Sequence, residues 1–413
     1  MRTERFGDYW FDRVLHLLYF QDPDTEHAVR ALMGDVLAPC PPVAWCETSR
    51  GTTRFPFQMN LRGLDVEARM RCVQDLAEVS FGGSAERAEN FEEHLRCTFG
   101  RSMCELFLFP YNRKMWKRSL SALAPSGFTW NITHPDFEAV LRGAFAEADF
   151  KAYNSAGWYP RPPASAGRRG MECLSAAIAS QAADLRCGCE VVAIHPERRE
   201  VTYRRAGRIE RIAYGEALLS TLPLPALMDL CDAVPAGVRS ACARLASNRV
   251  LSVAIGIQGP RPRAGHWRYY ADESLIFTRL VFLHEFDPGL APEDGWPLLV
   301  EVIEPSEQPR SDSDALVARV VADLSRARAL PEGSTVTSAR VMSIDPAYVV
   351  FGREDRPVVE AAHRFLSSHG ITSLGRYGKW EYSSMSSCIR DGRAWAHQLS
   401  RAAGRQASTV GSD

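Results

Sequence analysis

The sequence lacks several features that would assign a protein to a class at once. It contains no G-x-G-x-x-G turn, the glycine-rich segment that follows the first strand of a dinucleotide-binding unit and seats a pyrophosphate on a helix N-terminus. No apolar run approaches the roughly 18 residues that span a bilayer. The first residues lack the basic flank and apolar core of a signal peptide. We therefore expect a cytoplasmic protein with no membrane partner.

The chain also lacks an excess of charge of either sign. Its formal net charge is −1 and its pI is near 6.8. A protein of this charge has no whole-molecule field that attracts nucleic acid, so we expect no nucleic-acid partner. Arginines that bind phosphate would have to act locally.

The cysteines form no disulfide or zinc pattern. Eleven is an odd number, and the cysteines are scattered from Cys40 to Cys388, which indicates reduced thiols. Cys187 and Cys189 are a close pair, but no second C-x-x-C and no H-x-x-x-H supplies the other ligands of a zinc site. We interpret the cysteines as structural thiols.

The composition is that of a globular protein with two or three interdependent lobes, because 46% of the 413 residues are hydrophobic and 24% are charged. Two early segments have helical periodicity. Residues 24–37 place apolar side chains at every fourth position behind an Asp24/Thr25 cap, and residues 86–108 repeat the pattern until Pro110, where we expect the helix to stop. These segments predict an early helical lobe.

The middle of the chain changes to a period of two. Short alternating runs at 190–194, 200–203 and 208–214 predict a β-meander, followed by a buried strand within 217–225 and a helix through Leu227 and Leu230. Further strands are predicted at 250–257, 276–286 and 298–303. Helices are predicted near 311–328, 357–369 and 385–403. The mixture predicts an α/β core with an antiparallel sheet alongside.

The most specific patterns are Phe109-Pro-Tyr-Asn-Arg-Lys-Met-Trp116 and Gly375-Arg-Tyr-Gly-Lys-Trp-Glu-Tyr-Ser-Ser-Met385. Together they resemble the nucleotide-sugar pyranose/furanose mutases typified by UDP-galactopyranose mutase. Members of that family bind FAD and open with a G-x-G-x-x-G unit. This chain opens with residues 6–16, which resemble the part of the family that follows that unit. The resemblance implies an α/β fold of this type with a degenerate dinucleotide-binding core, a helical lobe and an antiparallel β-sheet.

The resemblance also implies a division into segments along the chain. We expect, in order, a remnant of the dinucleotide-binding core at 1–60, a helical lobe at 61–150, a core segment with the meander at 151–235, the antiparallel sheet and substrate lobe at 236–350, a C-terminal core segment at 351–405 and a mobile tail at 406–413.

A nucleotide sugar offers a flat base, a charged pyrophosphate and a polyhydroxyl ring, whose natural partners are aromatic faces, arginines, and tyrosines or carboxylates. By resemblance, Arg279 lies in the active cleft near the diphosphate. Its apolar neighbours make an unpaired cation costly, and a salt bridge to an internal Asp or Glu is the alternative. Arg376, Tyr377 and Tyr382 match a family pattern whose tyrosines reach the diphosphate. We expect these four residues to be catalytic.

Further residues are expected to contact the substrate, again by resemblance: Tyr111, Asn112, Arg113, Trp116, Tyr159, Arg161, Tyr270 and Trp380. From residue types alone, Trp116 is equally compatible with a core aromatic and Arg113 with a solvated charge.

Three departures from the family pattern predict that FAD is not bound. The G-x-G-x-x-G turn is absent. Serines at 383–387 replace the aspartates that flank a methionine at a helix N-terminus, although serines could still cap that helix. Prolines at 162 and 163 replace a glycine pair and lack its backbone donors. An arginine that members carry near 130–135 is also not evident, since Asn131 and His134 stand there.

Without flavin, another group must help the nucleoside diphosphate to depart, and a divalent cation, Mn²⁺ or Mg²⁺, chelated by the pyrophosphate is the simplest candidate. Residues of suitable type to hold it are Asp12, His16, His134 and Glu301. Each histidine alone is more often structural.

The shortened chain resembles a flavin-independent, metal-dependent branch that acts on GDP-sugars, such as GDP-L-galactose, in nucleoside-antibiotic pathways. We therefore expect a sugar-nucleotide isomerase, which could form a homodimer. Two alternatives stay open: a non-catalytic sugar-nucleotide-binding subunit, and a flavin oxidoreductase completed by a partner chain.

Overall fold

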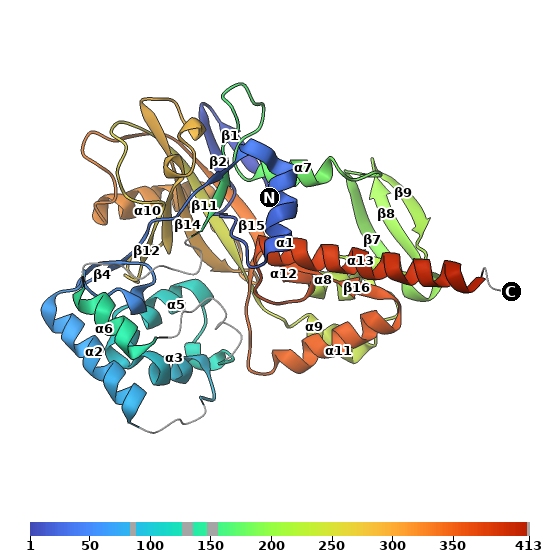
Figure 1. Cartoon of the computed structure of the whole chain (residues 1–413), viewed down its shortest axis with the longest axis horizontal. Helices are drawn as coiled ribbons and strands as arrows, with labels where there is room; N and C mark the ends of the chain where they lie inside the picture. Colours follow the sequence, from blue (N-terminus) through green and yellow to red (C-terminus); the bar gives the residue numbers. More distant parts are fainter. Residues whose placement is uncertain (83–87, 126–134, 147–155, 411–413) are drawn as a thin grey trace. The chain divides into compact units, whose positions relative to one another are not determined.

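The computed structural model describes residues 1–82, 88–125, 135–146 and 156–410, with side chains up to residue 401. The chain divides into two compact units, each assembled from three segments (Figure 1). The first unit comprises Met1–Tyr19, Leu32–Gln181 and Ala246–Arg353. The second comprises Phe20–Ala31, Ala182–Leu245 and Glu354–Asp413. The six-segment division stays a prediction.

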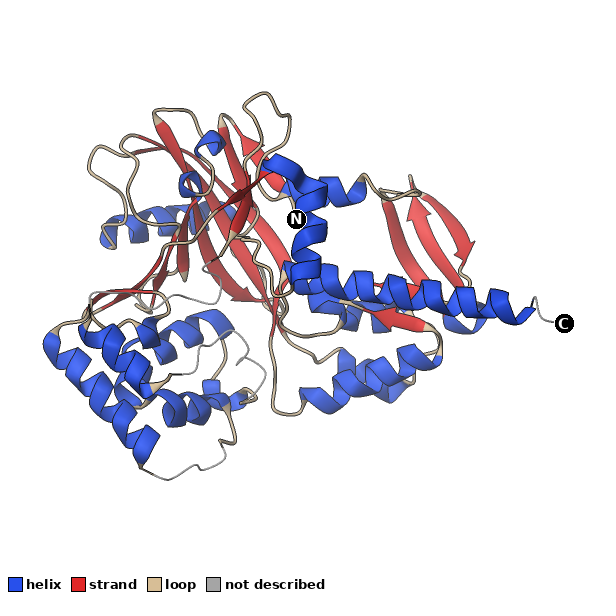
Figure 2. Cartoon of the chain, viewed as in Figure 1, coloured by secondary structure: helices blue, strands red, loops and turns tan. Residues whose placement is uncertain are grey.

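Within the described ranges, seven strands of the first unit form one sheet in the order β15-β11-β14-β13-β12-β4-β5 (Figure 2). Its pairs are antiparallel apart from β12 with β4. The strands are β4 (Ala44–Thr48), β5 (Gly51–Arg54), β11 (Ser247–Gln258), β12 (Trp267–Tyr270), β13 (Arg279–Phe282), β14 (Gly295–Pro305) and β15 (Thr335–Val349). The predicted antiparallel sheet is confirmed, although the strand predicted at 276–286 is shorter.

One face of this sheet is apolar. The odd-numbered side chains of β11, from Leu251 to Ile257, pack with α10 (Ser313–Arg326) through Leu316, Val320 and Leu324. Successive side chains of a strand point to opposite faces, so the even-numbered residues of β11 lie on the other face. The apolar face builds the core, and the opposite face carries the polar residues described below.

Helix α10 is fixed at both ends by carboxylates. The side chain of Asp312 accepts hydrogen bonds from the N–H groups of Asp314 and Ala315 and caps the helix start. Near its end, the buried Asp323 accepts the N–H of Ile276 at 2.7 Å and pairs with Arg319 and Arg326. This contact ties α10 to the segment that leads into β13.

The predicted helical lobe is present beside the sheet in the first unit. Its helical segments are α2 (Val66–Phe81), α3 (Phe91–Phe99), α4 (Arg101–Met103), a π-helical turn (Cys104–Leu108), α5 (Phe109–Trp116) and α6 (Phe137–Phe145). The prediction that Pro110 stops the helix is wrong. Pro110 follows the π-helical turn Cys104–Leu108, and the helical run continues through it to Trp116. The N–H of Phe109 bonds the carbonyl oxygen of Cys104, five positions back, and this shifted hydrogen-bond pattern accommodates the missing N–H of Pro110. Residues 86 and 87 of the predicted helix lie outside the described residues.

The first unit also contains the hairpin of β1 (Thr3–Phe6) and β2 (Tyr9–Asp12), the pair of β3 (Leu37–Pro39) and β6 (Trp158–Pro160), and α7 (Glu172–Ala179). The helix predicted at 24–37 is α1 (Pro23–Met33), whose residues up to Ala31 belong to the second unit. It ends earlier because Gly34 takes a φ of +53° and residues from Leu37 onward already belong to β3.

The second unit contains the predicted meander, formed by β7 (Cys189–His195), β8 (Glu200–Arg205) and β9 (Arg208–Ala213). The predicted buried strand within 217–225 is reduced to β10 (Leu218–Ser220), which pairs in parallel with β16 (Ile371–Ser373). The helices are α8 (Leu224–Leu230), α9 (Ala236–Cys242), α11 (Asp355–Ser368), α12 (Gly375–Gly378) and α13 (Met385–Val410). Helix α13 extends into the predicted tail, and residues 411–413 lie outside the description.

Short 3-10 turns connect several of these elements: Gly34–Val36, Phe57–Met59, Leu120–Ala122, Pro196–Arg198, Leu283–Glu285 and Pro288–Leu290. Among the helices that the structure describes, none has the length and apolar composition needed to cross a membrane.

We predict that Asp323→Ala lowers the free energy of unfolding by about 1–3 kcal/mol, because the buried N–H of Ile276 loses its acceptor. Chemical denaturation measures the change. The matched control is Asp314→Ala on the exposed first turn of the same helix, which should change stability by about 0.5 kcal/mol or less. Equal effects of the two substitutions would contradict this role of Asp323.

Candidate functional site

A row of mostly polar side chains crosses the sheet on the face opposite α10. Neighbouring strands place these residues directly opposite one another, so their side chains point to one face. We call this set the polar row; it consists of Ser252, Glu301, Arg279, Tyr269, Cys46 and Thr53. All except Arg279 and Tyr269 are fully buried.

A buried ion pair stands at the centre of the polar row. Both Nε and Nη2 of Arg279 donate to Oε2 of Glu301, at 2.9 and 2.5 Å, and the N–H of Leu15 donates to Oε1 at 3.1 Å. The Glu301 side chain is 1% exposed and that of Arg279 is 13% exposed. Burial alone would lower the pKa of Arg279, but Glu301 and neighbouring tyrosines raise it above its ordinary value.

The ion pair bears on what the sequence predicted for Arg279 and for Glu301. The internal salt bridge that the sequence left open for Arg279 is formed, and phosphate binding by Arg279 stays a proposal. Both carboxylate oxygens of Glu301 already accept hydrogen bonds, so Glu301 does not offer an uncommitted oxygen to a metal ion.

Aromatic rings extend the site from the polar row to α5. The guanidinium of Arg279 lies over the ring of Tyr269, 5.7 Å from its centroid. Tyr269 meets Tyr111 of α5 edge-on at 5.4 Å, and Tyr111 stacks on Phe107 at 5.3 Å. Burial raises the pKa of both tyrosines, so each keeps its hydroxyl proton at neutral pH. The site therefore offers aromatic faces and neutral hydroxyl groups beside a paired arginine.

Helix α5 is held against the sheet by buried polar side chains. Nδ2 of Asn248 donates to the carbonyl oxygens of Met115 and Trp116, at 2.8 and 3.0 Å. Nζ of the buried Lys114 donates to the carbonyl oxygens of Tyr270 and Asp272, at 3.0 and 2.8 Å. Burial lowers the pKa of Lys114 to about 7. These bonds fix the position of Tyr111.

The other predicted residues of α5 have structural partners. Trp116 is buried and donates from Nε1 to Oδ1 of Asn112 at 2.9 Å. Arg113 forms a two-pronged, half-exposed ion pair with Glu273, at 3.0 and 2.7 Å. The structure thus favours the core alternative for Trp116 and an ion pair at the surface for Arg113. Tyr111 is the predicted α5 residue that reaches the polar row.

Alternation along β12 changes the assignment of its two tyrosines. Tyr270 was predicted to contact the substrate, but its side chain belongs to the apolar core and packs edge-on against Phe277. Tyr269 points to the polar row instead. Sequence reasoning missed Tyr269 because the faces of β12 are set by its pairing with β13, and the pairing register was not known.

Three buried polar atoms on this face have no hydrogen-bond partner among the described residues: Oγ of Ser252, Oγ1 of Thr53 and Oδ1 of Asn248. Each of these residues is at most 1% exposed. Buried polar groups are nearly always satisfied by protein, water or ligand. All three atoms are enclosed by protein, so a contact with water or with a ligand would require neighbouring side chains to move.

The remaining predictions in the first unit fall outside the polar row. Asp12 accepts hydrogen bonds from Thr3 Oγ1 at 2.6 Å, from the Tyr159 hydroxyl at 2.7 Å and from the Met171 N–H at 3.1 Å. Burial raises the pKa of Asp12. Tyr159 is fully buried, and Arg161 donates from Nε to the carbonyl oxygen of Phe286 at 2.6 Å. These contacts are structural.

Three of the four predicted metal ligands, Asp12, His16 and Glu301, lie within the described residues. Asp12 and Glu301 are engaged as described, and Nδ1 of His16 lies 2.9 Å from the carbonyl oxygen of Val14. His134, like Trp130 and Asn131, lies outside the described residues. Across the part of the chain that the structure describes, no three His, Cys, Asp or Glu side chains are grouped so that they could hold a metal ion.

An apolar cavity of about 580 Å³ lies elsewhere in the first unit, lined by residues such as Met33, Pro162 and Ala176 with Arg168. It shares no residue with the polar row, so we do not place a nucleotide sugar there.

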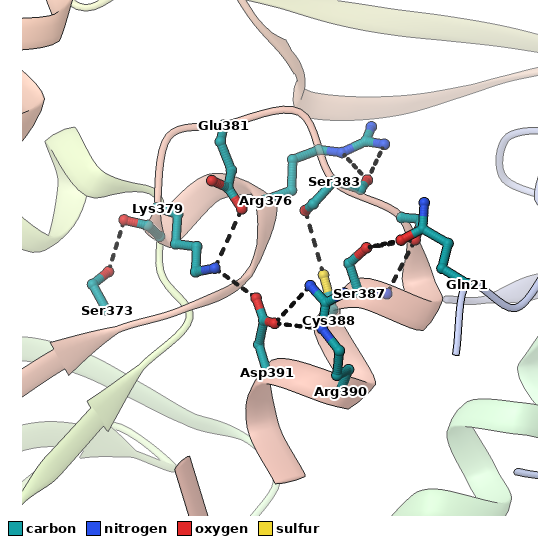
Figure 3. Close-up of polar contacts among 12 residues, drawn as sticks. Gln21, Ser373, Arg376, Lys379, Glu381, Ser383, Ser387, Cys388, Arg390 and Asp391 are labelled. Atoms are coloured by element: carbon teal, nitrogen blue, oxygen red, sulfur yellow. Dashed lines mark hydrogen bonds and ion pairs between the residues drawn. The ribbon is translucent and has the colours of Figure 1, made fainter. Parts of the chain in front are cut away.

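A second cluster lies in the second unit (Figure 3). Arg376 of α12 donates from Nε and Nη2 to the carbonyl oxygen of Ser383, at 3.1 and 2.6 Å, and its guanidinium lies 4.6 Å from the centroid of the Tyr382 ring. Nζ of Lys379 pairs with Asp391 of α13 at 2.6 Å. These contacts fix the segment between α12 and α13.

A serine side chain caps the start of α13, as expected from the serines at 383–387. Oγ of Ser384 accepts the N–H of Ser387 at 3.0 Å. Trp380 is 3% exposed and takes a φ of +54°, and its Nε1 has no partner in the described structure. It is a core residue of this unit, whereas Tyr377 and Tyr382 are half-buried.

The described residues of the second unit do not fit a flavin dinucleotide. Such a cofactor needs a strand that leads through a glycine-rich turn into a helix with available N–H groups. After β10, Pro223 stands at the cap of α8 and Pro225 in its first turn, which removes N–H donors there. After β16, the helix that follows, α12, has only four residues.

No family model matches the chain. Among solved structures, the chain is similar to reduced UDP-galactopyranose mutase, with a TM-score of 0.84 and 20% identity over 94% of this chain and 84% of that chain. The chain has a mixed α/β fold similar to that of UDP-galactopyranose mutase. It is also similar to a putative protoporphyrinogen oxidase from Exiguobacterium sp. 255-15, with a TM-score of 0.68 and 13% identity over 96% and 89% of the two chains.

A third similar structure is a CLA-producing fatty acid isomerase from P. acnes, with a TM-score of 0.58 and 11% identity over 96% and 89% of the two chains. At these identities the likeness establishes the fold alone. The predicted UDP-galactopyranose mutase-like architecture, with its helical lobe and sheet, is confirmed in that sense. The degenerate dinucleotide-binding core stays a prediction.

We predict that Arg279→Met lowers the free energy of unfolding by about 3–5 kcal/mol, because it leaves the Glu301 carboxylate buried without a cation. The double variant Arg279→Met/Glu301→Gln should regain at least half of this loss, since the glutamine can still accept the N–H of Leu15. Denaturant titration measures both. If the single variant Arg279→Met were as stable as the original protein, the ion pair would not stabilise this face of the sheet.

Proposed function

We propose that the protein is an isomerase that interconverts the pyranose and furanose forms of a nucleotide-bound hexose without using flavin. The observation that carries the proposal is that Arg279 and Tyr269 of the polar row lie together with Tyr111 of α5, on a fold similar to that of UDP-galactopyranose mutase. The proposed substrate class is a GDP-hexose such as GDP-galactose, within nucleoside-antibiotic or glycan sugar biosynthesis.

The residue chemistry supports a sugar nucleotide at this face. Arg279 is the cation for the diphosphate, and the rings of Tyr111 and Tyr269 are flat surfaces for a base or a sugar. Arg376, Tyr377 and Tyr382 of the second unit are proposed as separate contacts to the substrate.

The proposed reaction needs no redox step. The bond between the anomeric carbon and the diphosphate oxygen breaks, and the sugar 4-hydroxyl attacks the anomeric carbon and loses its proton. The bond from that carbon to the original ring oxygen then breaks, the ring oxygen takes up a proton, and the diphosphate reattaches. Atoms and charge balance, so the product is an isomer. Neutral tyrosine hydroxyls can donate hydrogen bonds to the departing diphosphate.

We further propose that a divalent cation enters on the diphosphate as part of the substrate. A metal-chelated leaving group carries less negative charge, which assists its departure. This form of metal dependence requires no three-ligand protein site.

One alternative also has a specific observation in its favour. The likeness to the putative protoporphyrinogen oxidase is compatible with a flavin oxidoreductase completed by a partner chain. A non-catalytic sugar-nucleotide-binding subunit is the other alternative. The prolines around the start of α8 weigh against the flavin reading, and turnover separates the mutase from the binding subunit.

We predict that purified protein converts a GDP-hexose to its furanose isomer in Mn²⁺ or Mg²⁺, and that EDTA abolishes the conversion. The measurement is chromatography of GDP- and UDP-hexoses incubated with each metal or with EDTA. Dithionite should have no effect, and the protein should show no flavin absorbance near roughly 450 nm. Substrate binding without turnover would favour the non-catalytic subunit, and a stoichiometric flavin band would favour the oxidoreductase.

We also predict that each arginine contributes to binding. Relative to the original protein, Arg376→Ala and the double variant Arg279→Met/Glu301→Gln should each raise the Kd for the sugar nucleotide about 10- to 150-fold, since a charge-assisted contact contributes about 1.5–3 kcal/mol. Calorimetry measures binding and denaturation measures stability. The control is Arg356→Ala on the exposed face of α11, which should leave both unchanged. Normal binding by either test variant would remove that arginine from the site.

A further inference from the structure

Cys187 and Cys189 differ in their surroundings from most of the other cysteines. Cys187 is exposed and Cys189 is half-buried, with Gly188 between them at a φ of +68°. A Cβ placed on Gly188 would meet no atom within 4 Å, so this turn lies in open space. Six of the eleven cysteines are buried in the described structure, and burial raises the pKa of thiols such as Cys40, Cys72 and Cys104. The pair is accessible to reagents from which most of the thiols are shielded.

The pair also lies beside unpaired positive charge. Cys189 is the first residue of β7 and stands directly opposite Arg205 of β8, which in turn stands opposite Arg208 of β9. Directly opposite side chains share one face of a sheet and are close neighbours. Neither Arg205 nor Arg208 forms an ion pair within the described residues, whereas nearby Arg204 and Arg186 pair with Glu190 and Asp184.

A thiolate is the form of cysteine that attacks a disulfide. Positive charge beside the pair attracts small disulfides that carry carboxylates. The accessible pair, its permissive glycine and the two unpaired arginines therefore combine the requirements for thiol–disulfide exchange.

We propose that Cys187 and Cys189 form a redox-active dithiol that reduces low-molecular-weight disulfides and closes to an intramolecular disulfide. This inference is independent of the proposed isomerase function. It also replaces the sequence-based interpretation of these two residues as structural thiols.

The exchange has two steps. The thiolate of the more exposed Cys187 attacks one sulfur of oxidised glutathione, and one glutathione leaves as a thiolate. The thiolate of Cys189 then attacks the Cys187 sulfur, the mixed disulfide breaks, and the second glutathione leaves. In sum, two protein thiols are oxidised to one disulfide, one glutathione disulfide is reduced to two thiols, and the protons are conserved.

The test uses the full, reduced protein with oxidised glutathione, followed by alkylation and peptide mass spectrometry. The peptide that contains both cysteines should lose two hydrogen masses and carry no glutathione. Cys97 is exposed and has no neighbouring cysteine in sequence, so it serves as the internal control and should keep a glutathione adduct. In Cys189→Ser, the adduct should accumulate on Cys187 because the second step is removed.

The arginines supply a second readout. Arg205→Ala/Arg208→Ala should slow oxidation of the pair by about 3- to 10-fold without changing the reactivity of Cys97, because the positive charge that attracts the carboxylates of the reagent is removed. The proposal is overturned if the original protein accumulates a glutathione adduct on Cys187, or if the pair is oxidised no faster than Cys97 reacts.

Discussion

The buried pair of Arg279 and Glu301 is the interaction on which the candidate site depends. Two charges enter the interior of a sheet at acceptable cost only when each is paired and hydrogen-bonded, and here the second Glu301 oxygen is satisfied by the N–H of Leu15. The pair also restricts the chemistry of the site. Because Glu301 already neutralises Arg279, a diphosphate must compete with a carboxylate for the guanidinium. In the proposed reaction, a diphosphate that carries a divalent cation would bring less negative charge near Glu301, which is compatible with the proposed metal dependence.

The sequence predicted the kinds of element well and their faces less well. The meander, the antiparallel sheet, α10 and α11 follow from hydrophobic period and capping residues, which are local properties. Tyr269 and Tyr270 show the limit. The pairing of β12 with β13 decides which of the two adjacent tyrosines lies in the polar row, and a shift of this pairing by one residue exchanges their faces. Pro110 shows a similar limit for helices. Whether a proline ends a helix depends on the hydrogen-bond pattern of the turn around it, and the sequence did not predict that pattern.

The partners of the arginines were even less accessible to sequence reasoning. Arg279 was predicted to need either an anion or an internal carboxylate, and the structure supplies Glu301, a neighbour only because β13 and β14 pair. Arg113 was placed against the nucleotide, yet Glu273, 160 positions away, holds its side chain. Residue type gives the charge of a side chain, whereas long-range pairing decides whether that charge is available to a ligand.

Three arginines of this chain illustrate how the partner sets the role. Arg279 is buried and paired with a carboxylate, so it stabilises the sheet and offers a ligand only a neutralised cation. Arg376 donates to a carbonyl oxygen and lies over the Tyr382 ring, and these contacts orient the guanidinium. Within the described residues, Arg205 forms no ion pair, and it stands directly opposite Cys189. Its positive charge attracts anionic reagents from solution. The partners of an arginine therefore decide whether it stabilises the sheet, is oriented by a carbonyl oxygen and a ring, or attracts an anion.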